Sequence, residues 1–135
     1  MQKIDQLIRL LVVDAIGQNW GKPPEAEVLQ IQKTRREFDG DFTVVVFPLL
    51  RFSKLSPEET GNVLGNYLVE NSKLLSGFNV IKGFLNLVVA QQYWKDFLLS
   101  DLQAPGYGCL KATMESPLVM IEYSSPNTNK PLHLG

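Results

Sequence analysis

Residues 56–89, SPEETGNVLGNYLVENSKLLSGFNVIKGFLNLVV, contain a helix signal that is followed directly by strand signals. Ser56 and Glu59, with Pro57 between them, have the form of a capping box with proline at the first helical position. The apolar residues that follow are spaced as on one face of a helix. We therefore expect a helix that ends at about Asn71 and is followed by strands.

Two short apolar runs, Phe78–Lys82 and Phe84–Val89, complete this segment. They are divided at Gly83, which predicts a hairpin or a bulged bend. The flanking sequence adds further elements, with a break at Pro48, which cannot lie in a central strand. We expect a helix over residues 4–16 and a half-buried strand over 26–34 with Val28 inward. A short strand from residue 42 should pass into a helical turn. A last helix, over 91–103, is expected to bury Tyr93, Trp94, Phe97, Leu98 and Leu102.

The predicted fold class is therefore α+β: a two-layer domain with helices packed on one face of an antiparallel sheet. The 135 residues are 44% hydrophobic and 20% charged, which excludes a disordered chain. The formal net charge of −1 argues against a basic clamp for nucleic acid, and we expect neither DNA nor a membrane as partner. One cysteine and one histidine make a poor metal site, and without a signal peptide the expected location is cytoplasmic.

Residues 104–108, APGYG, are the clearest break in the chain. Beyond them, the nearly continuous apolar run 117–123 is typical of a strand buried on both faces of a parallel sheet. We therefore expect a domain at 1–104, a linker at 105–116, and the truncated start of a Rossmann-like nucleotide-binding domain at 117–135.

The C-terminal sequence IEYSSPNTNKPLHLG, residues 121–135, carries most of the functional signal. A loop that leads from a parallel strand to a helix N-terminus offers free N–H groups and a positive dipole end to phosphates. Gly135 would let an adenosine group approach the backbone. His133 is the candidate to stabilise charge at the α-phosphate of ATP, with Lys130 adding a mobile positive charge.

This sequence resembles the nucleotide-site signature of class I aminoacyl-tRNA synthetases, in the form found in arginyl-tRNA synthetases. His133-Leu134-Gly135 match the first three positions of the HIGH motif. Upstream, residues 40–42, 56–58 and 83–86 resemble landmarks of the additional N-terminal domain of that family, in order. The resemblance implies an N-terminal fragment of an arginine–tRNA ligase, inactive alone, whose parent enzyme uses ATP with Mg²⁺, arginine and tRNA(Arg). It also implies that Glu122, Ser125 and Asn127 face the arginine pocket.

A second candidate site lies in the run 84–89. Alternation along a strand places Phe84 and Asn86 on the face opposite Leu85 and Leu87. An aromatic ring beside a carboxamide suits an unpaired RNA base, which needs stacking and directed hydrogen bonds. The resemblance implies the same role, because the family reads a base of the tRNA D-loop with this strand, and Lys82 is the candidate phosphate contact.

Several alternatives remain open from the sequence alone. Phe84 and Asn86 also suit a core phenylalanine and a surface asparagine, and Arg35 and Arg36 suit either a tRNA contact or a solvated turn. Phe78 and Asn79 repeat the pair, but as neighbours they point to opposite faces. The whole chain also suits a stand-alone, non-catalytic RNA-binding module, or another class I synthetase.

Overall fold

The computed structural model describes residues 4–22 and 28–122. The chain divides into two compact units, Met1–Pro105 and Gly106–Gly135. All helices and strands within the described ranges belong to the first unit, in an order that matches the predicted one. They are α1 (Ile4–Trp20), β1 (Ile31–Lys33), β2 (Phe42–Val45), η2 (Phe47–Leu49), α2 (Leu50–Ser53), α3 (Pro57–Asn71), β3 (Leu75–Ile81), β4 (Phe84–Val89), α4 (Gln91–Asp96) and η3 (Phe97–Asp101).

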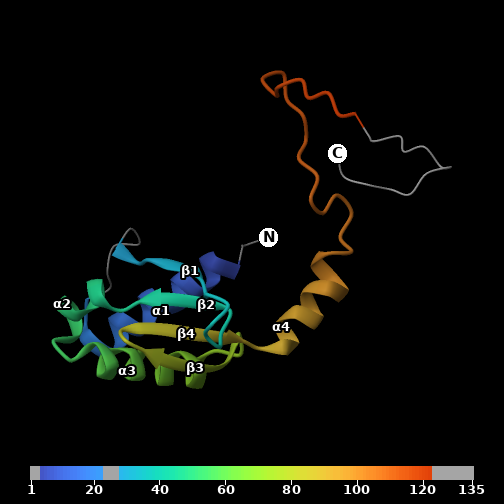
Figure 1. Ribbon diagram of the computed structural model, residues 1–135. Coiled ribbons are helices and arrows are strands. Elements are labelled where there is room, and N and C mark those ends of the chain that lie inside the picture. Colours follow the sequence, from blue (N-terminus) through green and yellow to red (C-terminus); the bar gives the residue numbers. More distant parts are fainter. Residues whose placement is uncertain (1–3, 23–27, 123–135) are drawn as a thin grey trace, which may run out of the picture. The chain divides into compact units, whose positions relative to one another are not determined.

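The four strands form one antiparallel sheet in the order β1-β2-β4-β3. Helices α1 and α3 pack on one face of it, which we call the inner face, and Figure 1 shows the sheet with α1 behind it. The predicted α+β class with helices on an antiparallel sheet is therefore confirmed for the first unit. The core between the layers includes Ile8, Val12 and Ile16 of α1, Leu64 and Leu68 of α3, and Val44, Leu85 and Leu87 of the sheet.

Helix α3 begins as the sequence predicts. Ser56 accepts a hydrogen bond from the backbone N–H of Glu59 at 3.2 Å, and its own backbone N–H donates to Glu59 Oε2 at 3.1 Å. The Ser56 hydroxyl also donates to Glu59 Oε2 at 2.7 Å, and this hydrogen bond, together with the one from the Ser56 backbone N–H, lowers the pKa of the Glu59 carboxyl below its ordinary value. The helix ends at Asn71, so both predicted ends are confirmed.

Two glycines of α3 bring this helix close to the sheet. A Cβ at Gly61 would lie 2.8 Å from Cγ1 of Val80, and a Cβ at Gly65 would overlap the ring of Phe78. Because both glycines lie on the buried face of α3, the helix backbone packs directly on β3. This close approach leaves β3 and β4 fixed beneath the helix.

Strands β3 and β4 are joined by the two residues Lys82 and Gly83, so the predicted hairpin is confirmed. Both residues have positive φ angles, 48° and 78°, and Ile81 pairs with Phe84 across the turn. Two consecutive left-handed residues define a type I′ turn, which matches the twist of the flanking strands. Phe47 packs against this turn, because a Cβ at Gly83 would lie 2.6 Å from its Cζ.

The segment around Pro48 also follows the prediction. Strand β2 ends at Val45, and the chain then enters η2 and α2. The strand expected over 26–34 is shorter, Ile31–Lys33, and residues 26–27 lie outside the described residues. Leu29, not Val28, is buried here at 3% exposure, because its carbonyl accepts a hydrogen bond from Arg9 Nη1 at 2.8 Å and holds the segment on α1.

The prediction that a helix over 91–103 buries its apolar face is wrong. The chain forms α4 over Gln91–Asp96 and a π-helical turn over Phe97–Asp101. Tyr93 contacts the core, but three of the side chains predicted to be buried are exposed. They are Trp94 at 42%, Leu98 at 53% and Leu102 at 42%. Helical spacing shows that residues share a face, but not that another layer covers it.

The second unit is described over residues 106–122, where no helix or strand is assigned. Short turns lie at 106–109 and 113–116. The apolar run that predicts a strand of a parallel sheet is exposed here, with Leu118 at 97% and Met120 at 92%. The run thus has no sheet partner among residues 4–22 and 28–122, and Tyr123 lies outside the described residues.

Candidate nucleic-acid interface

A row of four polar side chains crosses the whole sheet on its outer face, the face opposite α1 and α3. Gln32 of β1 pairs with Thr43 of β2, Thr43 with Asn86 of β4, and Asn86 with Asn79 of β3. Directly opposed residues in adjacent strands point to the same face of a sheet. We call these four residues the polar row. The neighbouring row, with Val44, Leu85 and Val80, faces the core.

Hydrogen bonds connect three members of the polar row. The Thr43 hydroxyl donates to Asn86 Oδ1 at 2.6 Å, and Asn86 Nδ2 donates to Asn79 Oδ1 at 2.8 Å. Asn79 Nδ2 in turn donates to the backbone carbonyl of Asp39 at 2.7 Å. Asn86 and Thr43 are only 2% and 4% exposed, although α1 and α3 pack on the opposite face of the sheet.

The loop over residues 34–41 explains this burial. Its end is held to β4, because Asp41 Oδ2 accepts from the backbone N–H of Val89 at 2.8 Å. Gly40 lies so close to β4 that an added Cβ would be 3.1 Å from Cβ of Asn86. Gly40 has a φ of 130°, a conformation that favours glycine. The loop therefore lies over Asn86 and carries Phe38 above the outer face.

Phe84 lies on the same face as Asn86, as the strand alternation predicts. It remains 38% exposed, whereas Leu85 and Leu87 are fully buried. Its ring packs edge-on against Phe47, with ring centroids 6.1 Å apart and an interplanar angle of 80°. Next to the turn at 82–83, the exposed ring of Phe84 is therefore held in place by the ring of Phe47.

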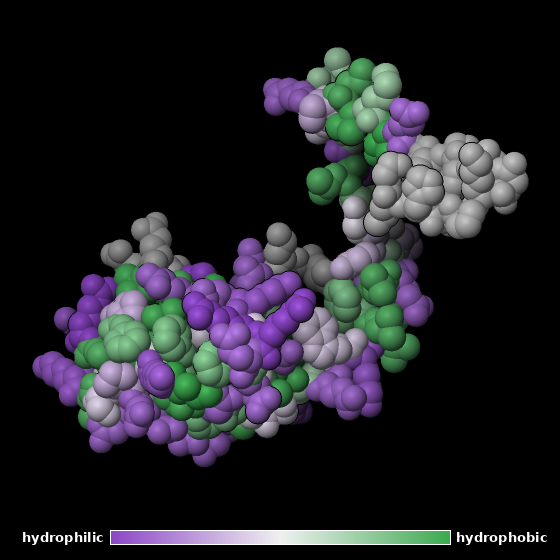
Figure 2. Space-filling view, in the orientation of Figure 1, coloured by the Kyte–Doolittle hydropathy of each residue, from purple (hydrophilic) through white to green (hydrophobic). Residues whose placement is uncertain are grey.

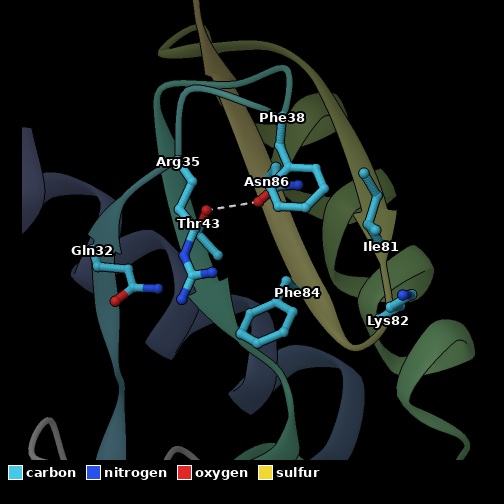
Figure 3. A pocket seen from close by; sticks show the side chains of 8 residues that line it. All are labelled: Gln32, Arg35, Phe38, Thr43, Ile81, Lys82, Phe84 and Asn86. Atoms are coloured by element: carbon cyan, nitrogen blue, oxygen red, sulfur yellow. Dashed lines mark hydrogen bonds between the residues drawn. The ribbon is translucent and has the colours of Figure 1, made fainter.

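These features enclose a pocket of about 230 Å³ on the outer face. Figure 3 shows the Phe38 and Phe84 rings at its rim, with Thr43 and Asn86 hydrogen-bonded at its base. Figure 2, in the orientation of Figure 1, shows hydrophilic and hydrophobic side chains mixed over the folded unit. The pocket is lined by Gln32, Arg35, Phe38, Thr43, Ile81, Lys82, Phe84 and Asn86.

The charged residues described at the pocket have one sign. Two of the described lining residues are cationic, Arg35 and Lys82, and none of them is acidic. Within the described part of the chain, neither cation has a hydrogen bond or an ion pair from its side chain to another residue. Both are exposed, so both are free to meet an anionic group such as a phosphate.

The structure brings the three candidate RNA-contact residues, Phe84, Asn86 and Lys82, together at one pocket. It corrects the alternative that Asn86 is a surface residue, since Asn86 is buried. The prediction that Phe78 and Asn79 point to opposite faces of the strand is confirmed: Phe78 packs on Gly65, and Asn79 forms a hydrogen bond with Asn86. The sequence did not suggest three other lining residues, Phe38, Thr43 and Gln32, as RNA contacts. Their position at the pocket depends on the register of the strands and on the closure of the 34–41 loop.

The candidate nucleotide and arginine residues lie at the other end of the chain. Glu122 is exposed in the second unit. Lys130, His133, Gly135, Ser125 and Asn127 lie outside the described residues. Among the described residues, no group of side chains could hold a metal ion, and no helix is both long and apolar enough to cross a bilayer.

Comparison with known proteins adds independent information. No family model matches the chain. It is 53% identical over 132 residues to "Arginine--tRNA ligase" of Parabacteroides distasonis, and 50% identical over 133 residues to the protein of the same name from Phocaeicola vulgatus. Each match covers 98% of this chain and 22% of the relative.

A solved structure shows the same fold at lower identity. Thermus thermophilus arginyl-tRNA synthetase matches with a TM-score of 0.53 and 17% identity, over 65% of this chain and 14% of that one. By sequence, the chain is similar to one part of aminoacyl-tRNA synthetases. The relatives that it matches are arginine–tRNA ligases, and it corresponds to their N-terminal part and spans about 22% of their length.

Proposed function

We propose that this chain is the tRNA-recognising N-terminal part of an arginine–tRNA ligase. In this proposal, residues 1–104 bind the elbow of tRNA(Arg) through the outer-face pocket, 105–116 form a linker, and 117–135 begin the catalytic domain. The parent enzyme would activate arginine with ATP and transfer it to the tRNA 3′ end. The observation that carries the proposal is the exposed Phe84 ring beside Asn86, in a chain half identical to arginine–tRNA ligases.

The pocket supplies the interactions that an unpaired base requires. The exposed face of Phe84 offers stacking, which contributes roughly 1–3 kcal/mol per base. Asn86 offers an amide at the base of the pocket, and amides discriminate bases by hydrogen bonds to their edges. Arg35 and Lys82 line the same pocket, so their charges are available to the phosphates of a bound strand.

The charge balance suits positioning more than tight non-specific binding. The formal net charge of the chain is −1, so its long-range attraction for RNA is weak. Local cations at the pocket still direct a bound strand. We therefore expect the domain to select and orient tRNA(Arg), while the rest of the parent enzyme supplies most of the affinity.

The nucleotide site is proposed from sequence alone. His133 and Gly135 would meet ATP, with Mg²⁺ entering as its counter-ion, and Lys130 would assist at the phosphates. Glu122, Ser125 and Asn127 would face arginine, with Glu122 pairing with its α-ammonium group. The catalytic domain would be Rossmann-like, with residues 117–123 as its first strand, and the parent enzyme cytoplasmic.

The test of RNA binding compares two exposed aromatic residues. Phe84→Leu keeps an apolar side chain against Phe47 but removes the stacking surface, so we expect affinity for a tRNA(Arg) transcript to fall roughly tenfold or more. Trp94→Leu, at a similarly exposed position of α4 outside the pocket, is the matched control and should bind as the parent chain does. Fluorescence anisotropy with labelled transcript measures both. Equal affinity of the two variants would contradict the proposal.

A further inference from the structure

We propose that Asn79 is a positioning residue that fixes the direction of the Asn86 amide, and thereby selects which base the pocket accepts. This inference rests on the proposed function, because it concerns the specificity of the same pocket. It is carried by the relay of hydrogen bonds that begins at Asp39 and ends at Thr43.

The relay has one direction because its first member is a backbone carbonyl. The Asp39 carbonyl only accepts, so the Asn79 group that lies 2.7 Å away must be its NH₂. The Oδ1 of Asn79 is then the atom that faces Asn86, at 2.8 Å. Since Oδ1 also only accepts, the Asn86 group that meets it must be Nδ2.

The far side of Asn86 agrees with this direction. With Nδ2 directed toward β3, the Oδ1 of Asn86 faces β2 and accepts from the Thr43 hydroxyl at 2.6 Å. The Thr43 hydroxyl also lies within donating distance of the Thr34 hydroxyl, at 3.0 Å, and because it has one proton it serves one of these two acceptors at a time.

A reversed Asn86 amide would break this match. Its Oδ1 would face Oδ1 of Asn79, and two acceptors would be opposed at a site that is 2% exposed. An unsatisfied polar group in a buried site is costly enough to hold such a state below roughly a tenth of the population. Asn86 is therefore held in one direction before any ligand arrives.

This direction determines what remains for a base. An amide has two acceptor positions on oxygen and two protons on nitrogen, and the relay uses one of each. What Asn86 still offers in the pocket is one acceptor on the side of β2 and one donor on the side of β3. Bases differ in the order of donors and acceptors along their edges, so a fixed order accepts some edges and rejects their reverse.

Two substitutions of Asn79 separate this effect from the loss of the loop contact. Asn79→Ser and Asn79→Asp both remove the amide N–H that binds the Asp39 carbonyl, and Asn79→Asp also opposes a carboxylate oxygen to that carbonyl, so the loop contact is lost in both variants. The carboxylate of Asn79→Asp still only accepts, and it keeps Nδ2 of Asn86 directed toward β3. The hydroxyl of Asn79→Ser donates or accepts, so it leaves the amide free to reverse.

The measurement is the base preference of the 135-residue chain. The probes are a tRNA(Arg) transcript and a set of transcripts in which each D-loop base is replaced in turn. The base preference is the Kd for the disfavoured base divided by the Kd for the favoured base, taken at the D-loop position where replacement has the largest effect. We expect Asn79→Asp to keep this ratio within about twofold and Asn79→Ser to lower it roughly fivefold or more, with little change for the disfavoured transcripts. Circular dichroism checks folding, and Asn79→Thr, a residue favoured in strands, replaces Asn79→Ser if that variant does not fold.

The outcomes distinguish this inference from the proposed function. If the unsubstituted 135-residue chain binds no transcript, or if Phe84→Leu binds as tightly as the unsubstituted chain, the proposed function fails and the inference fails with it. If the unsubstituted chain binds with an affinity that depends on Phe84 but shows no base preference, only the inference fails. The inference is likewise overturned if Asn79→Ser keeps the full preference, or if Asn79→Asp loses as much of it.

Discussion

Gly65 of α3 lies directly against the ring of Phe78 in β3, and the space between them does not admit a methyl group. Gly61, one turn earlier, meets Val80 of the same strand in the same manner. This contact determines how closely the helix layer approaches the sheet, and therefore where the outer-face pocket stands relative to the core. It also gives the first testable expectation.

Gly65→Ala is expected to destabilise the chain by about 1–3 kcal/mol through overpacking, although alanine is the better helix former. Three ring atoms of Phe78 lie in the way of the new Cβ, and the ring is packed against the core. Chemical denaturation measures the free energy of unfolding. Gly77→Ala is the control, since a Cβ there meets nothing within 4 Å. A Gly65→Ala variant more stable than the parent chain would show that Phe78 moves freely.

Lys82→Asn should separate stability from RNA binding. Lys82 has a φ of 48°, and asparagine tolerates this left-handed conformation better, so we expect a gain of up to about 1 kcal/mol. The loss of one cation should weaken tRNA binding and reduce the steepness of log Kd against log salt by about 0.7–0.9.

Lys54 provides a matched control for this substitution. It is also left-handed, with φ 57°, but it ends α2 and does not line the pocket. Lys54→Asn should therefore stabilise the chain without changing the salt dependence of tRNA binding. Equal effects of the two variants on RNA binding would argue against a phosphate contact at Lys82.

Glu59 should make folding stability depend on pH through the capping box. Hydrogen bonds from Ser56 lower its folded pKa below the ordinary value of 4.5, so ionised Glu59 stabilises the folded state. This contribution is complete above the unfolded pKa and is lost as pH falls through the lower folded pKa. Glu59→Gln should show less change of stability than the parent chain across that acidic range, and thermal unfolding at a series of pH values measures the difference.

Asp41→Ala should loosen the loop that overhangs the pocket. The Asp41 carboxylate accepts the Val89 N–H at 2.8 Å, and its loss is expected to cost about 1–2 kcal/mol. Affinity for tRNA should fall as well, because the same loop carries Phe38. Asp39→Ala is the control, since Asp39 contributes its backbone carbonyl to the site and not its carboxylate. A tRNA affinity unaffected by Asp41→Ala would show that the loop does not contribute.

The purified chain is expected to catalyse no arginine-dependent exchange of pyrophosphate into ATP. It spans about 22% of the length of the arginine–tRNA ligases that it matches, and the apolar run 117–122 is not paired in a sheet within the described residues. A nucleotide site of this class needs the neighbouring strands of a parallel sheet. Exchange above background would contradict this expectation.

The predictions from sequence succeed where the signal is local. The capping box fixes the start of α3, and the turn residues Lys82 and Gly83 fix the hairpin. Alternation along β4 correctly places Phe84 and Asn86 on one face, because the side-chain period of a strand is independent of its surroundings.

Features that depend on distant parts of the chain were not predictable in this way. Thr43 reaches Asn86 from 43 residues away, and Asn79 reaches the Asp39 carbonyl from 40 residues away. Both contacts depend on strand register, which the sequence of one strand does not reveal. The burial expected for Trp94 failed for a related reason, since periodicity along α4 says nothing about the presence of a covering layer.

The polar row takes one residue from each of the four strands, so the proposed recognition surface exists only when β1 and β3 have both joined the central pair. A newly synthesised or damaged copy that lacks either outer strand would leave Asn86 without a defined direction or the pocket without a wall. Under the proposed function, such a copy would compete poorly for tRNA, and capture of the nucleic acid would thereby report that the domain has finished folding.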